Sequence, residues 1–182
     1  MAKKTAKLVI LCEDLQQAVF AKHFFKRHGF NTKKMRFEIG PKGKGAGEQY
    51  VRTQYAEEVK LYRQTSSYSP VGSYLIVVID ADKLTVSQRL NQLDSALKDD
   101  GQPKRQANEK IAIFVPKRNI ETWIHYLMGE KVDEQKAYAK LAREGDCEPY
   151  IKKLVSKICP LGLPEDAPLS LKLACDELQR IL

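Results

Sequence analysis

Four short apolar runs, each of the length of one β-strand, constrain the fold of this 182-residue chain most strongly. The first, third and fourth are apolar almost throughout, which is typical of parallel strands covered on both faces, whereas the second alternates. A helical pattern of apolar residues follows each of the first three runs. This order predicts an α/β fold with a parallel four-stranded sheet flanked by helices. The predicted strands are residues 7–12, 35–39, 74–79 and 111–115.

After the fourth strand the pattern is helical only. We therefore predict an α/β domain over residues 1–118 and a C-terminal helical extension over residues 119–182 that packs on it. The predicted helices of the extension are residues 120–128, 134–142, 148–158 and 168–182.

Positive charge is concentrated in the first third of the chain. Of the net charge of +8, residues 1–63 carry the whole surplus, with 14 Lys and Arg against 6 Asp and Glu. Clustered basic residues are the footprint expected of a protein that binds a phosphate backbone, so nucleic acid is the predicted partner. A solvated surface is the alternative. The candidate binding residues are Lys22, Lys26, Arg27, Lys42 and Lys44.

The N-terminal apolar run is too short for a signal peptide or a membrane span, so we expect a cytoplasmic protein without a membrane partner. The four cysteines contain no C-x-x-C pair, and we expect buried, reduced thiols.

Acidic residues follow two of the predicted strands. Glu13 and Asp14 come directly after the first strand, and Asp80 and Asp82 come after the third. Because all strands of a parallel sheet end at one edge, we expect these carboxylates to share one rim. Carboxylates held close together repel each other, and a hard divalent cation relieves that repulsion. Glu13, Asp80 and Asp82 are therefore candidate ligands of Mg²⁺ or Mn²⁺.

Each acid also has a structural alternative. Asp14 with Gln17 matches a capping box in outline, which favours helix capping over metal binding for Asp14. Asp80 and Asp82 could cap the third helix or its turn, and Glu13 alone could be a surface acid. Only their combination at one rim indicates a site.

Two basic residues, Lys117 and Arg118, follow the fourth strand. Beside the acidic rim, the Lys could stabilise charge on a phosphoryl group and the Arg could hold a phosphate with two hydrogen bonds. The loop of residues 40–47 is rich in Gly and Lys, but Ala46 and Gly47 replace the Lys and Ser/Thr of a P-loop. Two interpretations of this loop remain open: a basic loop that approaches a phosphate backbone, and a plain connector.

The segments LVILCED and LIVVIDAD resemble the Toprim (topoisomerase–primase) domains also found in overcoming-lysogenization-defect nucleases. The resemblance covers residues 7–118 and implies that Glu13, Asp80 and Asp82 bind magnesium for phosphodiester chemistry. The later string P-x-x-x-I-E-x-W is similar to one in compact Toprim-like proteins and makes Glu121 a secondary candidate. Glu48, at the start of the second helix, is another, although a first-turn acid also complements the helix dipole.

Three functions remain open. The leading one is a Mg²⁺-dependent nuclease acting on DNA or RNA, for which the resemblance also implies phage defence beside an ATPase partner. The second is a receiver-like phosphoacceptor domain, which has acids after strand one, an Asp after strand three and a Lys after a late strand. The third is a non-catalytic nucleic-acid-binding adaptor, for which the basic first third suffices.

Overall fold

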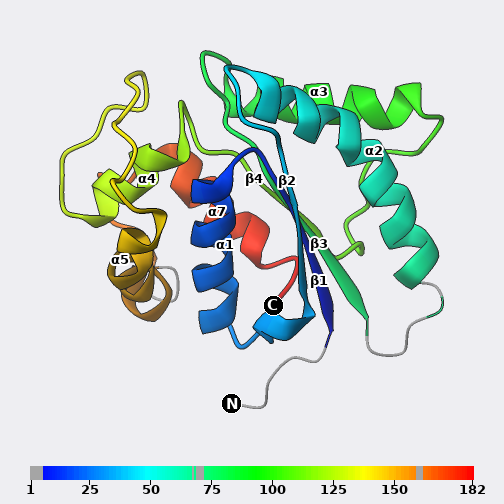
Figure 1. The fold of residues 1–182 in the computed structure, drawn as a ribbon, viewed down its shortest axis with the longest axis horizontal. Helices are drawn as coiled ribbons and strands as arrows, with labels where there is room; N and C mark the ends of the chain where they lie inside the picture. Colours follow the sequence, from blue (N-terminus) through cyan, green and yellow to red (C-terminus); the bar gives the residue numbers. More distant parts are fainter. Residues whose placement is uncertain (1–5, 67, 69–71, 159–161) are drawn as a thin grey trace.

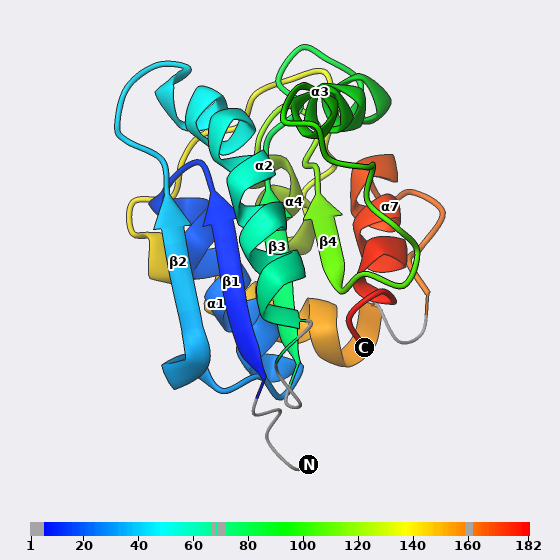
Figure 2. The same ribbon diagram turned by 90° about the vertical axis from the view of Figure 1, so that its right-hand side faces the viewer.

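The computed structural model describes residues 6–66, 68, 72–158 and 162–182. Four parallel strands form one sheet in the order β2-β1-β3-β4, which confirms the predicted α/β class (Figure 2). Each strand lies within one residue of its predicted bounds. The strands are β1 (Lys7–Cys12), β2 (Met35–Ile39), β3 (Ser73–Val78) and β4 (Ile111–Phe114).

Helices cover both faces of the sheet (Figure 1). One layer contains α2 (Ala46–Ser66) and α3 (Val86–Asp99). The other contains α1 (Leu15–Arg27), α4 (Ile120–Leu127), α5 (Glu148–Lys153) and α7 (Leu169–Leu178). Short turns are η1 (Thr32–Lys34), η2 (Glu144–Cys147) and the π-helical η3 (Leu154–Ile158). No helix in the described ranges is long and apolar enough to cross a membrane.

The sheet is buried on both faces at β1, β3 and β4 because these strands alternate between two cores. In β1, Leu8 and Ile10 pack in the core beneath α1, whereas Leu11 packs in the core beneath α2 and α3. This explains why β1 is apolar almost throughout. The segment 119–182 contributes Trp123 and Leu171 to the first core, so it completes the covering of the sheet.

The segment 134–142 is not helical, and this prediction is wrong. Its polar side chains bind parts of the fold that are distant in sequence. Glu134 accepts hydrogen bonds from the amides of Leu169 and Ser170, and Lys140 pairs with Asp14. Contacts with residues distant in sequence thus determine the structure of this segment, against its helical pattern.

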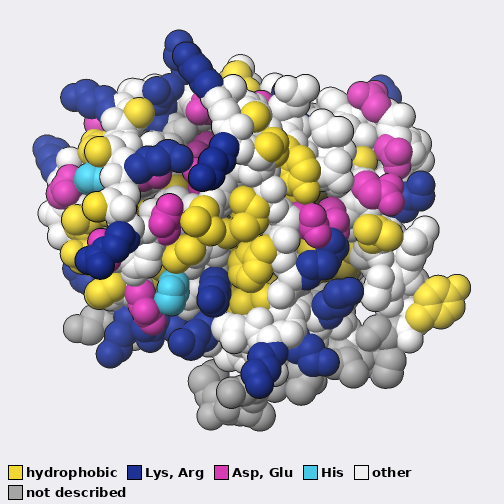
Figure 3. All heavy atoms as spheres, in the orientation of Figure 1, with side chains coloured by type: hydrophobic (Ala, Val, Ile, Leu, Met, Phe, Trp, Pro, Cys, Tyr) yellow, Lys and Arg dark blue, Asp and Glu magenta, His cyan; other side chains and the backbone are white. Residues whose placement is uncertain are grey.

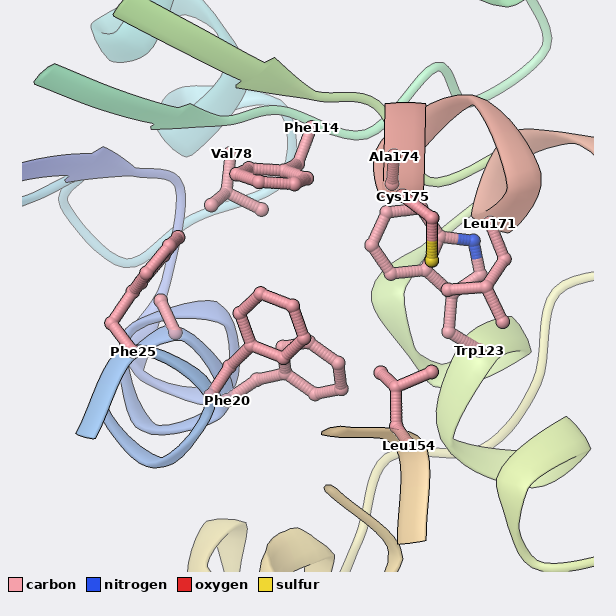
Figure 4. A pocket seen from close by; sticks show the side chains of 11 residues that line it. Phe20, Phe25, Val78, Phe114, Trp123, Leu154, Leu171, Ala174 and Cys175 are labelled. Atoms are coloured by element: carbon pink, nitrogen blue, oxygen red, sulfur yellow. The ribbon is translucent and has the colours of Figure 1, made fainter. Parts of the chain in front are cut away.

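A small apolar cavity of about 20 Å³ lies between the sheet and the α1 layer. Figure 4 shows Phe20, Phe114 and Trp123 around it, with Cys175 of α7 at its wall. The space is too small for a ligand, and its apolar lining offers a water no hydrogen-bond partners, so we interpret it as a packing defect.

The redox state of one described cysteine differs from the prediction. Cys12 and Cys147 are buried and free, as predicted. Cys175 is disulfide-bonded, so the prediction of a reduced thiol is wrong there.

A buried hydroxyl, Ser170 Oγ, joins α7 to the rest of the C-terminal half. It accepts from Trp123 Nε1 at 2.8 Å and from the amide of Lys117 at 3.2 Å, and it donates to Glu134 Oε1 at 2.5 Å. One side chain thus satisfies two buried donors.

We expect Ser170→Ala to lower the free energy of unfolding by about 1–3 kcal/mol, because it leaves buried N–H groups of Trp123 and Lys117 unsatisfied without opening a large cavity. Urea unfolding measures the effect. Ser95→Ala, at an exposed position of α3, is the control. Equal stability of the two variants would contradict the role of this hydroxyl.

Candidate functional site

The carboxyl ends of β1 and β3 bring two of the predicted acids together. Glu13 follows β1, and Asp80 lies two residues after β3, on the neighbouring strand of the sheet. The amide of Asp80 donates a hydrogen bond of 2.5 Å to Glu13 Oε1. The common rim expected from a parallel sheet therefore exists for this pair.

Both residues are half-buried, so part of each carboxyl group is withdrawn from water. Burial raises the pKa of Glu13 to about 7, although the hydrogen bond from Asp80 partly opposes the rise. Burial, reinforced by the negative charges of Glu13 and Glu121, raises the pKa of Asp80 well above its ordinary value. Asp80 Oδ1 is buried and has no hydrogen-bond partner among the described residues. The rim thus holds more negative charge than its surroundings neutralise.

Glu121, a secondary candidate, belongs to the same buried cluster. It lies in the first turn of α4, is 1% exposed, and its Oε1 lacks a hydrogen-bond partner. Burial raises its pKa as well. The string around Trp123 therefore supplies a carboxylate whose charge acts on Asp80.

Asp82 differs from Asp80 in its exposure and backbone. Its side chain is 58% exposed, and its φ of +52° lies in the left-handed region. An isolated antiparallel bridge pairs it with Arg118, whose φ is +69°. Two non-glycine residues with positive φ at one place indicate local strain, which proteins retain mostly at functional sites.

Arg89 of α3 is the principal site residue that the sequence reasoning missed. It is 3% exposed, and its Nε donates to the carbonyl of Asp80 at 2.9 Å. Its guanidinium also pairs with Asp82 and Glu48. A signal was present in the sequence, because Arg89 lies in register with Leu93 and Leu97 on the buried face of α3.

Glu48, the other secondary candidate, lies in the first turn of α2. Its carboxylate pairs with Arg89 and also accepts hydrogen bonds from Arg52. Two guanidinium groups therefore neutralise Glu48, in contrast to the buried acids Asp80 and Glu121.

The two basic residues after β4 have different surroundings. Lys117 is 9% exposed, and its ammonium group donates to the carbonyls of Asp82 and Leu84. It thus holds the D-x-D loop in place. Arg118 lies beside Asp82, and its buried Nε has no hydrogen-bond partner.

Both ends of the Gly/Lys loop are anchored on Glu13. A Cβ at Gly40 or at Gly47 would lie 2.7 or 2.5 Å from the carbonyl oxygen of Glu13. Only glycine lets β2 and α2 approach Glu13 this closely. Lys42 and Lys44 are exposed on the loop between these two glycines.

The basic residues of α1 lie elsewhere. This helix begins at the rim with Leu15 and runs away from it (Figure 1), so Lys26 lies about 16 Å along the axis from its start. Lys22 and Lys26 are exposed, whereas Arg27 pairs with Glu148 at 3.3 Å. These three are not brought together with Lys42 and Lys44.

Asp14 caps α1, as predicted, because its Oδ1 accepts from the amide of Gln17 at 3.0 Å. Its Oδ2 pairs with Lys140 at 2.8 Å. The non-helical segment 134–142 thus supplies a cation at the edge of the acidic cluster.

Within the described part of the chain, no three His, Cys, Asp or Glu side chains are already arranged to hold a metal ion. Comparison with known protein families, with curated proteins and with solved structures found no match. A function for this chain is therefore inferred from the residues of the rim alone.

We expect Gly47→Ala to lower the free energy of unfolding by about 1–3 kcal/mol, because the added methyl group would overlap the backbone of Glu13. Urea unfolding tests this. Gly145→Ala is the matched control, since a Cβ there meets no atom within 4 Å. If both variants have the same stability, the close approach at Glu13 is wrong.

The raised pKa of Glu13 predicts a pH dependence in metal-free buffer. The folded pKa of about 7 lies above the ordinary value of 4.5, so the protonated group stabilises the fold at low pH. This contribution is lost as pH rises from about 4.5 to about 7, because the unfolded chain releases its proton first. Glu13→Gln cannot ionise at this position.

The free energy of unfolding of the wild type, minus that of Glu13→Gln, should therefore fall across this window. Urea unfolding at several pH values measures it. A difference that stays constant with pH would contradict the burial of an ionisable Glu13.

Proposed function

We propose that this protein is a Mg²⁺-dependent enzyme that hydrolyses phosphodiester bonds in nucleic acid. The observation that carries the proposal is the half-buried pair of Glu13 and Asp80, whose pKa values are both raised and whose Asp80 Oδ1 has no hydrogen-bond partner in the described part of the chain. The exposed Lys42 and Lys44 lie on a loop anchored at the same Glu13. An acidic centre beside a basic loop suits a metal and a phosphate backbone together.

The donor set fits magnesium in its chemistry. Carboxylate oxygens are the ligands Mg²⁺ prefers, and it commonly takes one or two from the protein and the remainder from water and substrate phosphate. Glu13, Asp80 and Asp82 would hold it. When bound, it would polarise the phosphodiester and lower the pKa of a bound water.

The chain's own residues would supply the other functions. Glu13 would serve either as a metal ligand or as a general base. In the second role its pKa, raised to about 7 without a metal, lets it accept a proton near neutral pH. Arg118, beside Asp82, could hold a phosphate oxygen. Lys117 would act through the loop, since its ammonium group binds the carbonyls of Asp82 and Leu84.

We expect the wild type to cleave DNA or RNA with Mg²⁺ or Mn²⁺ and to lose cleavage in EDTA. Asp80→Asn should reduce the rate at least 100-fold, because it removes a charged oxygen from the acidic centre while keeping the shape of the side chain. Gel-based cleavage of labelled single- and double-stranded substrates measures this. Glu57→Gln, at an exposed position of α2, is the matched control.

The same variants separate the alternatives. Equal cleavage by Asp80→Asn and wild type would refute the site. Salt-dependent binding without cleavage, unchanged in Asp80→Asn, would favour the adaptor. Labelling of Asp80 by acetyl phosphate would favour the receiver-like domain.

A further inference from the structure

We propose that two copies of this chain associate through β2, whose outer edges pair antiparallel about a two-fold axis at Phe37. The inference does not depend on the proposed chemistry.

The two edges of the sheet differ in whether their outer backbone groups have partners. On β4, the amide of Ile113 donates to Glu177 at 2.9 Å, and Arg105 donates to the carbonyl of Ile111 at 3.0 Å. Helix α7, which carries Glu177, lies against this strand (Figure 2). On β2, no described segment pairs along the outer edge. An open edge is a template for another strand.

The backbone groups on the open edge can be assigned by alternation. The amide of Gly40 donates to the carbonyl of Cys12 at 2.9 Å, so the even positions of β2 turn toward β1. The odd positions, Phe37 and Ile39 among them, turn outward. Met35 uses its amide in a turn, donating to Thr32, but its carbonyl is on the outer side. The middle of β2 therefore presents both donors and acceptors.

The sequence of β2, MRFEI, is complementary to itself when reversed. With Phe37 opposite Phe37 of the second copy, Arg36 lies opposite Glu38 and Met35 lies opposite Ile39, twice by symmetry. At directly opposed positions opposite charges thus meet across the two-fold axis, where they would extend the ion pairs that Arg36 already makes with Glu38 and Glu58 of its own chain. Such cross-strand pairs stabilise antiparallel strands.

The side chains of the edge are also suited to burial. Met35 and Phe37 are only partly covered by the core, and Ile39 is 39% exposed. Leu15 of α1 is 52% exposed. Figure 3, which faces the β2 edge, shows apolar side chains gathered over the middle of this face. Charge complementarity favours a second copy over an unrelated peptide as the occupant.

Disulfide trapping tests the register. We expect Phe37→Cys to form a disulfide-linked dimer on mild oxidation, because directly opposed residues have Cα atoms about 5.5 Å apart. Met35→Cys and Ile39→Cys should each stay unlinked alone, since each residue lies about 13 Å from its own copy, but should link when mixed. Non-reducing electrophoresis with wild type as control gives the readout. Absence of linkage at position 37, or equal linkage of all three single variants, would overturn the register.

Light scattering tests the association itself. The mass of the wild type should rise toward twice the monomer value of 20.7 kDa with concentration. Ile39→Lys should keep the monomer mass, whereas Leu61→Lys, also at a residue with 39% exposure but on α2, should behave as wild type. A monomeric wild type at all concentrations, or an Ile39→Lys variant that associates equally well, would refute the interface.

Discussion

The hydrogen bond from the Asp80 amide to the Glu13 carboxylate joins the ends of the two central strands, and the rest of the site depends on it. Because β1 and β3 are covered by helices on both faces, the residues that follow them are also withdrawn from water. Two carboxyl groups at that position favour their neutral forms. The fold therefore brings the two carboxyl groups together where their charged forms are unfavourable. Binding of a proton or of an external cation would relieve this unfavourable charge.

The cations near the rim do not remove this conflict, because they bind mainly the backbone or the outer acids. Arg89 donates to the Asp80 carbonyl and pairs with Glu48 and Asp82. Lys117 donates to carbonyls of the D-x-D loop. These contacts fix the path of the loop, including the left-handed backbone of Asp82, but they leave Asp80 Oδ1 without a partner. Positive charge is thus used to position the acids while Asp80 Oδ1 stays available.

The sheet and its acidic rim could be predicted because they follow from local patterns. Apolar runs identify strands, and parallel strands end at one edge. The same patterns could not show that residues 134–142 cross the surface to reach Asp14 and α7, because side-chain partners distant in sequence decide this. Nor could they assign Lys117 to carbonyls rather than to a substrate. The role of Arg89 could have been predicted, since a charged residue on the buried face of α3 requires a partner.

Strand β2 connects the acidic rim with the open edge of the sheet. Within the described ranges it pairs with another strand on one side only, and Gly40, directly after it, packs on the carbonyl of Glu13. The loop that carries Lys42 and Lys44 starts at that contact and ends at Gly47, on the same carbonyl. A second strand paired with β2 would hold the start of this loop more firmly while leaving its exposed lysines free. Association at the edge would therefore order the basic loop beside Glu13 without covering it.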